Sequence, residues 1–230
     1  MTLNEALKKL QTLGTAQNRK VYARHGVTGE MYGVSFANLG KLKKTIKTDH
    51  ALALRLWSTG NHDARVLATM IADPEKMSAR DLEAWVKDLD NHIIAGAFSG
   101  LASKTTSARK LMEKWTGSRD EWAGAAGWSV LAGLAADDPG LEDAYLGKYL
   151  GTIESTIHSS ANRVRYAMNN ALISIGARNE ALEKKAVAAA RRIGPVEVDH
   201  GETDCTTPEA VSYIRKTAAH RKRKQARAHA

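Results

Sequence analysis

Signals that begin and end helices recur along the whole chain, and they constrain its fold more than any other feature. Thr2-Leu-Asn-Glu5 has the form of a capping box, and Leu7 and Leu10 follow at the spacing of one helix face. Asp49 and Ser78 precede further helical segments as N-caps. Only four prolines interrupt the 230 residues, so few helices are forced to break. The sequence therefore predicts an all-α protein.

The same signals divide the chain into roughly a dozen helices of about 10–18 residues. A capping box at Ser118 to Glu121 opens one of them, and the last begins at Thr207-Pro208-Glu209 with proline in the first helical position. Residues 91–103 are apolar enough to be mostly buried. The other helices are expected at residues 17–25, 36–47, 49–57, 61–72, 78–89, 107–115, 118–135, 141–158, 162–175 and 180–193.

The connections between these segments are short, apart from residues 26–34 and 194–206. Short connections join antiparallel neighbours, and many helix pairs in series are typical of an α-solenoid of HEAT-like pairs. The alternative is a non-repetitive helical bundle, because no strict sequence repeat is visible. We expect residues 1–216 to form a single helical repeat domain.

The positive charge is concentrated at the C-terminal end. Residues 215–230 carry seven Lys and Arg and no acid, which leaves only +2 of the net +9 for residues 1–214. We expect residues 217–230 to be a basic, partly disordered tail, and a solvated end that only aids solubility is the alternative. A basic total favours a polyanionic partner, with DNA as the leading candidate.

Several classes of protein are disfavoured. Cys205 is the only cysteine, so no disulfide forms within the chain. No run of about 18 apolar residues is present, so neither a membrane span nor a membrane partner is expected. We expect the protein to be cytoplasmic. We also expect it to be a monomer. No GxxxxGK pattern occurs, so no nucleotide cofactor is expected. His200 and Cys205 are the only soft ligands near 199–205, so no metal site is predicted.

Cationic side chains on the predicted helices are the candidates for contacts with DNA phosphates. Each of them taken alone is equally an ordinary surface charge, and only clustering in space would give it meaning. The candidates are Arg55, Arg65, Arg163, Arg165, Arg191, Arg192, Lys222 and Arg223.

Five stretches give the chain a family resemblance. They are DHALALRLWSTGNHDARVLATMIADP (49–74), WVKDLD (85–90), EWAGAAGW (121–128), NRVRYAMNNALISIG (162–176) and the ending IGPVEVDHGETDCTTPEAVSYIRK (193–216). Together they resemble the DNA alkylation repair family of HEAT-like repeat, AlkD-type DNA glycosylases, and the ending resembles a variant branch. The resemblance implies an α-solenoid whose positively charged concave face holds DNA.

The resemblance also implies a chemistry, the release of positively charged 3- and 7-alkylpurines. A carboxylate stabilises the oxocarbenium-like sugar or positions a water. In active members an Asp works with two Trp and an Arg, and the Asp falls on Asp90. The first Trp, one turn before the Asp, falls on Val86. The adjacent Trp85 points about 100° away around a helix, so it could substitute only if the helix were rotated. The Arg falls near Ala125 and the second Trp near Asn170, whose amide could still bind a phosphate or a base edge.

Only one of the four expected roles is therefore filled, and three hypotheses remain open. The first is a DNA-binding protein with weak or no base excision. The second is an active alkylpurine glycosylase that uses Asp90, and the third is a protein–protein scaffold. For Asp90 itself, the alternative to a catalytic or DNA-facing role is an N-cap or turn residue at the junction of Leu89 and Asn91.

Overall fold

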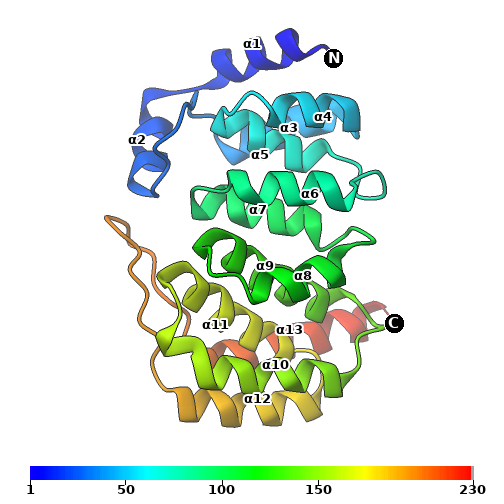
Figure 1. Ribbon diagram of the computed structural model, residues 1–230, viewed down its shortest axis with the longest axis vertical. Coiled ribbons are helices and arrows are strands. Elements are labelled where there is room, and N and C mark those ends of the chain that lie inside the picture. Colours follow the sequence, from blue (N-terminus) through cyan, green and yellow to red (C-terminus); the bar gives the residue numbers. More distant parts are fainter. Residues whose placement is uncertain (229–230) are drawn as a thin grey trace. The chain divides into compact units, whose positions relative to one another are not determined.

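The computed structural model describes the backbone of residues 1–228 and the side chains of residues 1–223. Within that range the chain has thirteen α-helices, two short 3₁₀ turns and no strand (Figure 1). The helices fall into two compact units. Unit 1 comprises residues 1–108 with 200–204, and unit 2 comprises residues 109–199 with the chain from 205 onward.

Unit 1 is built around α5, which packs against α3, α4 and α7. Its Ala64, Leu67 and Ala68 are fully buried. The elements of this unit are α1 (Leu3–Leu13), α2 (Ala16–Arg24), α3 (Phe36–Ile46), α4 (His50–Trp57), α5 (His62–Ile71), α6 (Ala79–Trp85), η1 (Val86–Asp88) and α7 (His92–Ala102).

Two of the predicted caps in unit 1 are confirmed. The Thr2 hydroxyl accepts from the backbone N–H of Glu5, and the Glu5 carboxylate accepts from the backbone N–H of Thr2, which completes the capping box. The Asp49 carboxylate accepts from the backbone N–H of Leu52 and begins α4. Each cap satisfies N–H groups that the helix itself leaves unpaired.

A buried carboxylate holds the long loop between α2 and α3. Asp63, in the first turn of α5, is fully buried. It accepts hydrogen bonds from three consecutive backbone N–H groups of the loop, those of Tyr32, Gly33 and Val34, over 2.6, 3.0 and 2.7 Å. These bonds offset the cost of burying the charge, so α5 fixes the path of the loop.

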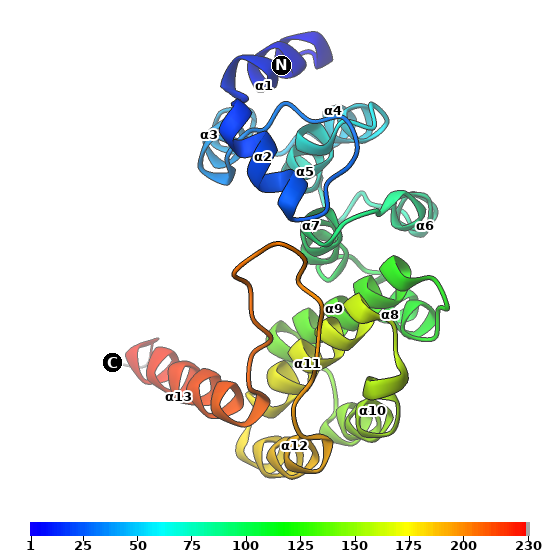
Figure 2. The ribbon, with the colours of Figure 1, turned by 90° about the vertical axis from the view of Figure 1, so that its left-hand side faces the viewer.

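Unit 2 is arranged around α11, which lies among α9, α10, α12 and α13 (Figure 2). The unit's elements are α8 (Ala108–Thr116), α9 (Glu121–Asp137), α10 (Asp143–Thr156), η2 (Ile157–Ser159), α11 (Asn162–Gly176), α12 (Glu180–Ile193) and α13 (Ala210–Ala228).

Small residues let α9 approach its neighbours closely. A Cβ added to Gly127 would lie 2.5 Å from the backbone nitrogen of Thr116, and one added to Gly124 would lie 3.1 Å from Cγ2 of Val164. The Ala and Gly residues of EWAGAAGW therefore serve packing, because the surrounding backbone leaves no room for larger side chains at these glycines.

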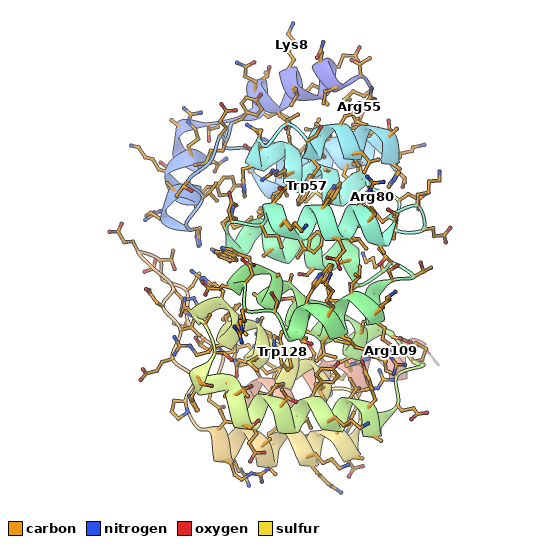
Figure 3. All side chains as sticks on the ribbon, in the orientation of Figure 1. Lys8, Arg55, Trp57, Arg80, Arg109 and Trp128 are labelled. Atoms are coloured by element: carbon orange, nitrogen blue, oxygen red, sulfur yellow. The ribbon has the colours of Figure 1, made fainter. Side chains whose placement is uncertain are left out.

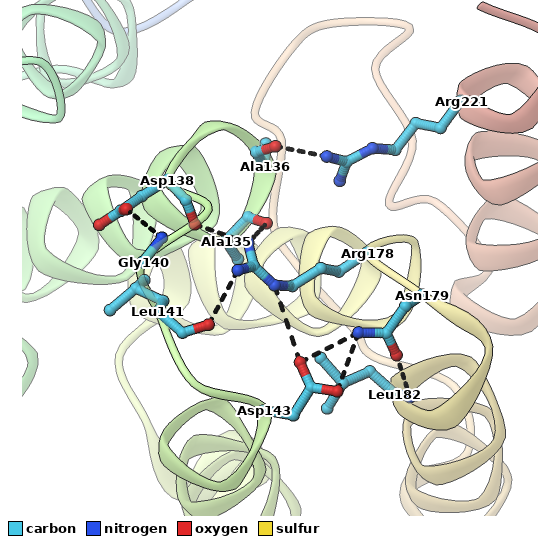
Figure 4. Close-up of polar contacts among 10 residues, drawn as sticks. All are labelled: Ala135, Ala136, Asp138, Gly140, Leu141, Asp143, Arg178, Asn179, Leu182 and Arg221. Carbon is cyan, nitrogen blue, oxygen red and sulfur yellow. Dashed lines mark hydrogen bonds and ion pairs between the residues drawn. The ribbon is translucent and has the colours of Figure 1, made fainter. Parts of the chain in front are cut away.

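Arg178 holds the end of α9 (Figure 4). Its guanidinium donates to the backbone carbonyls of Ala135, Asp138 and Leu141 over 2.8 to 3.0 Å. Its Nε lies 3.8 Å from the carboxylate of Asp143. Carbonyls at a helix C-terminus lack partners within the helix, so this side chain fixes the turn between α9 and α10.

Three predicted helix boundaries are wrong. The helix predicted to run from Ser78 through Leu89 ends at Trp85, and the 3₁₀ turn η1 follows it. The N-cap of α9 is Asp120, because the hydroxyl of Ser118 instead accepts from the N–H of Asp120. The last helix begins at Ala210 and not at Pro208.

The predicted domain boundary at residue 216 stays a prediction. Helix α13 runs from Ala210 to Ala228 and so continues across it. Residues 229–230 of the predicted tail lie outside the described residues. Within the described part of the chain, no helix has both the length and the apolar character that a membrane crossing requires.

Candidate functional site

Asp90 lies in the turn between η1 and α7. Its side chain is exposed, and its Oδ1 accepts a hydrogen bond from Nδ2 of Asn91 over 2.7 Å. Asn91 is the N-cap of α7, with its Oδ1 accepting from the backbone of Ile93 and Ile94. The geometry is that of the turn residue considered as the alternative for Asp90.

The Asp90 carboxylate faces the loop between α2 and α3. A Cβ added to Gly29 would lie 3.9 Å from Oδ2 of Asp90. The buried ring of His62 is close enough for Asp90 to act on its charge: burial lowers the pKa of His62, and the charges of Asp63 and Asp90 oppose that shift. The lowered pKa favours the neutral form of His62 near pH 7.

Two of the three positions expected to assist Asp90 are occupied by buried apolar side chains. Val86 is 4% exposed and Ala125 is 6% exposed. Val86 opens η1, and Ala125 lies between the closely packed glycines of α9. Neither can present an aromatic face or a guanidinium to a ligand. The third position, Asn170, is partly exposed on α11.

The family can now be assigned. A family model described as "DNA alkylation repair enzyme" matches residues 4–214. The chain belongs to the DNA alkylation repair enzyme family. The predicted family resemblance is thereby confirmed.

Relatives of this DNA alkylation repair family member cover almost the whole chain. The uncharacterized protein Lin0241 of Listeria innocua is 28% identical over 223 residues, which span 94% of this chain and 97% of that protein. The uncharacterized protein Lmo0209 of Listeria monocytogenes is 27% identical over 223 residues, with the same coverage.

One solved structure is similar along nearly its full length. It is described as a new family of proteins related to the HEAT-like repeat DNA glycosylases with affinity for branched DNA structures. It has a TM-score of 0.87 and 29% sequence identity, and the match covers 96% of this chain and 95% of that chain. The predicted all-α, HEAT-like fold is thereby confirmed.

In unit 1 of this DNA alkylation repair protein, the two candidate arginines differ in their surroundings. Arg55 is exposed on α4 (Figure 3). Arg65 is already engaged: its Nη2 lies 3.4 Å from the carboxylate of Asp88, and its guanidinium lies 5.3 Å from the ring centroid of Trp57. Arg55 is therefore the better placed of the two to meet a phosphate.

In unit 2, Arg192 is the candidate cation that is held by an acid, because it donates two hydrogen bonds to the Glu154 carboxylate over 2.5 and 2.8 Å. This contact lowers the pKa of Glu154. Four further cations of this unit are partly or fully exposed: Arg163 and Arg165 on α11, Arg191 on α12, and Lys222 on α13. Arg223, also exposed, has its Nε bonded to the carbonyl of Ala219.

A stacked tryptophan pair beside the Asp90 segment was not predicted from the sequence. The rings of Trp57 and Trp85 stack in parallel with centroids 4.0 Å apart, and both residues are buried. Nε1 of Trp57 donates to the Asp88 carboxylate over 2.8 Å. Trp85 therefore serves the core and cannot replace the aromatic residue missing at Val86.

Proposed function

We propose that this protein binds branched or otherwise distorted duplex DNA and holds it with little or no base excision. The observation that carries the proposal is the burial of Val86 and Ala125, at the positions where the family resemblance expects a Trp and an Arg. The scaffold of a DNA alkylation repair protein is retained, and core residues stand at two of the four positions expected for excision.

The chemistry supports the absence of efficient excision. A cationic alkylated base needs an electron-rich aromatic face, and the developing oxocarbenium sugar needs a preorganised anion. Asp90 could supply the anion, but its Oδ1 is already bonded to the side-chain amide of Asn91. Neither an aromatic side chain from position 86 nor a guanidinium from position 125 is present to orient the nucleotide.

Both units supply cations for the binding step. Arg55 in unit 1 and Arg163, Arg165, Arg191 and Lys222 in unit 2 reach the surface. Contacts between such side chains and phosphates provide most sequence-independent affinity for DNA. We expect Arg65 and Arg192 to add less, because each is already paired with an acid. The affinity of the similar solved protein for branched DNA supports this choice of ligand.

Competition binding tests the proposal. The full chain is mixed with a labelled four-way junction, and unlabelled junction or linear duplex of the same arm sequence competes. We expect the junction to compete more strongly than the duplex. Equal competition by both would remove the preference for branched DNA, and an absence of any binding would favour the protein–protein scaffold.

A matched pair of variants on α12 tests whether the exposed cations carry the affinity. Arg191→Gln and Lys184→Gln remove one positive charge from the same helix, but Lys184 is paired with Glu180 at 3.4 Å. We expect Arg191→Gln to weaken junction binding severalfold and Lys184→Gln to leave it nearly unchanged. Equal effects would indicate that net charge, and not a defined contact, attracts the DNA.

A further inference from the structure

A cavity of about 310 Å³ lies within unit 2, between α11, the end of α12 and the start of α13. Asn169 contributes the wall from α11, and Arg191 contributes the wall from α12. Pro195, Val196, Pro208 and Val211 give the cavity a largely apolar lining. The cavity is therefore concave, mostly apolar and supplied with few polar groups, as small-ligand sites are.

Asn169, in the wall of this cavity, has a hydrogen-bond acceptor that no described group uses. The residue is fully buried, and its Nδ2 donates to the backbone carbonyl of Pro208 over 2.9 Å. That bond fixes the orientation of the amide, since a flipped amide would place two acceptor oxygens together. Within the described part of the chain, Oδ1 of Asn169 has no hydrogen-bond partner. Buried polar groups are rarely left in this state without a ligand or a water.

Two charged side chains, Arg191 and Glu209, also line the cavity. Arg191 is exposed in the last turn of α12. The carboxylate of Glu209 accepts from the backbone N–H groups of Val211 and Ser212 at the start of α13. The hydrogen bonds from Ser212 are the main cause of the lowered pKa of Glu209. The Glu209 carboxylate is therefore occupied in capping α13. Arg191 is the cation at the rim of the cavity that can contact a ligand.

From this arrangement we infer that the cavity takes one unstacked nucleobase of the bound DNA; the inference rests on the proposed function. The volume lies at the lower end of ligand pockets, which span about 300–1,000 Å³, and so suits a single nucleoside. An amino group on the base edge donates to Oδ1 of Asn169, the flat faces lie against the proline and valine side chains, and the adjoining phosphate meets Arg191. Unpaired bases at a branch point leave the stack at low cost.

Two valines of the same loop give a matched test. Val196 lines the cavity, whereas Val198 does not. Val196→Trp fills the cavity at its loop side, and Val198→Trp adds the same bulk to the same loop outside it. The full chain and both variants are first compared for affinity to a branched DNA whose single unpaired base, at the branch point, is 2-aminopurine.

The fluorescence of that base is then read in each complex. The described residues that line the cavity include no aromatic ring, so a base held there escapes quenching. We expect the 2-aminopurine fluorescence to rise severalfold over that of the free DNA when the wild type or Val198→Trp binds, and not to rise when Val196→Trp binds. Binding without a rise in the wild type, or equal rises in both variants, would overturn the inference while leaving the proposed function standing.

Titration with deoxyadenosine monophosphate gives a readout that does not depend on DNA binding. We expect saturable changes in the NMR signals of the Asn169 side-chain amide at millimolar nucleotide. The changes should be lost in Val196→Trp, and weaker with the monophosphate of purine deoxyriboside, which lacks the amino group. No change in the wild type would overturn the inference. Loss of junction affinity altogether would instead overturn the proposed function.

Discussion

The side-chain amide of Asn91 donates to the Asp90 carboxylate over 2.7 Å, while the other end of the same amide caps α7. Asp90, on which the resemblance places the catalytic carboxylate, is therefore bonded to the side chain that caps α7. This contact holds the Asp90 side chain beside the start of α7.

Substitution of Asp90 should not change base release. Because Val86 and Ala125 offer no aromatic or cationic partner, we expect wild type and Asp90→Asn to release 7-methylguanine from DNA at the same background rate. The measurement is a single-turnover assay with protein in excess over methylated DNA. Release by the wild type above background that disappears in Asp90→Asn would establish the glycosylase hypothesis.

Loss of the Asp88 carboxylate should destabilise unit 1. Asp88→Ala leaves the buried indole N–H of Trp57 without its acceptor and frees Arg65 from its ion pair. A buried donor without a partner costs about 1–3 kcal/mol. The exposed ion pair adds less, because solvent screens it. Urea denaturation measures the change in the free energy of unfolding.

Asp90→Ala is the control for that substitution, since Asp90 is exposed in the same segment. We expect it to change the free energy of unfolding by no more than about 0.5 kcal/mol, as surface substitutions usually do. Equal losses from both variants would show that the Trp57 contact does not stabilise the unit.

Two helix-interior glycines should respond to alanine in opposite directions. A Cβ at Gly127 meets the backbone of Thr116, whereas one at Gly147 meets nothing within 4 Å. We expect Gly127→Ala to destabilise the protein by about 1–3 kcal/mol through overpacking. Gly147→Ala should stabilise it by roughly 0.5–1 kcal/mol through lower backbone entropy. Thermal unfolding of both variants measures the difference, and a stable Gly127→Ala would contradict the close packing of α8 and α9.

Stability should fall in mild acid because of His62. Burial lowers the pKa of His62 in the folded state, so the unfolded chain binds a proton at a higher pH than the folded chain does. The stability held by the neutral ring is complete above the unfolded pKa of about 6.5. It is lost as the pH falls below that value toward the folded pKa.

Denaturant titrations at several pH values test this behaviour. Between pH values near 7 and near 5, we expect the free energy of unfolding to fall less steeply in His62→Phe than in the wild type. Identical slopes in the two proteins would show that another group causes the acid sensitivity.

The local signals of the sequence predicted those features that depend on residues within one helical turn. The caps at Thr2 and Asp49 formed as expected, and Gly194 ends α12 with a positive φ of 72°. In each case the side chain or the glycine acts on backbone groups close to it in the chain, so the pattern carries the necessary information.

Boundaries that depend on distant contacts were not predictable in this way. The helix predicted through Leu89 ends at Trp85, and the following turn η1 is bonded to side chains of α4 and α5. The Asp88 carboxylate accepts from the indole of Trp57, and its backbone carbonyl accepts from Arg65. The start of the last helix was decided locally. The carboxylate of Glu209 accepts from the N–H groups of Val211 and Ser212, and α13 begins at Ala210, two residues after the predicted start at Pro208.

The candidate site was predictable only in part. The resemblance predicted roles at Asp90, Val86, Ala125 and Asn170, and these assignments stay predictions; it did not indicate that Val86 and Ala125 are buried. The cavity at Asn169 was missed, although Asn169-Asn170 interrupts an otherwise apolar stretch of α11. A polar pair within a helix does not reveal which of its members is buried, because that depends on how α12 and α13 pack around it.

The salt dependence of junction binding tests the central claim most directly. The affinity of the full chain for a four-way junction is measured from low to physiological salt. We predict a linear fall of the logarithm of the binding constant with the logarithm of salt concentration, with a slope of about −0.9 for each phosphate neutralised. Several contacts should contribute, and Arg191→Gln should reduce the slope by about 1. A flat response, or no binding at low salt, would contradict the account.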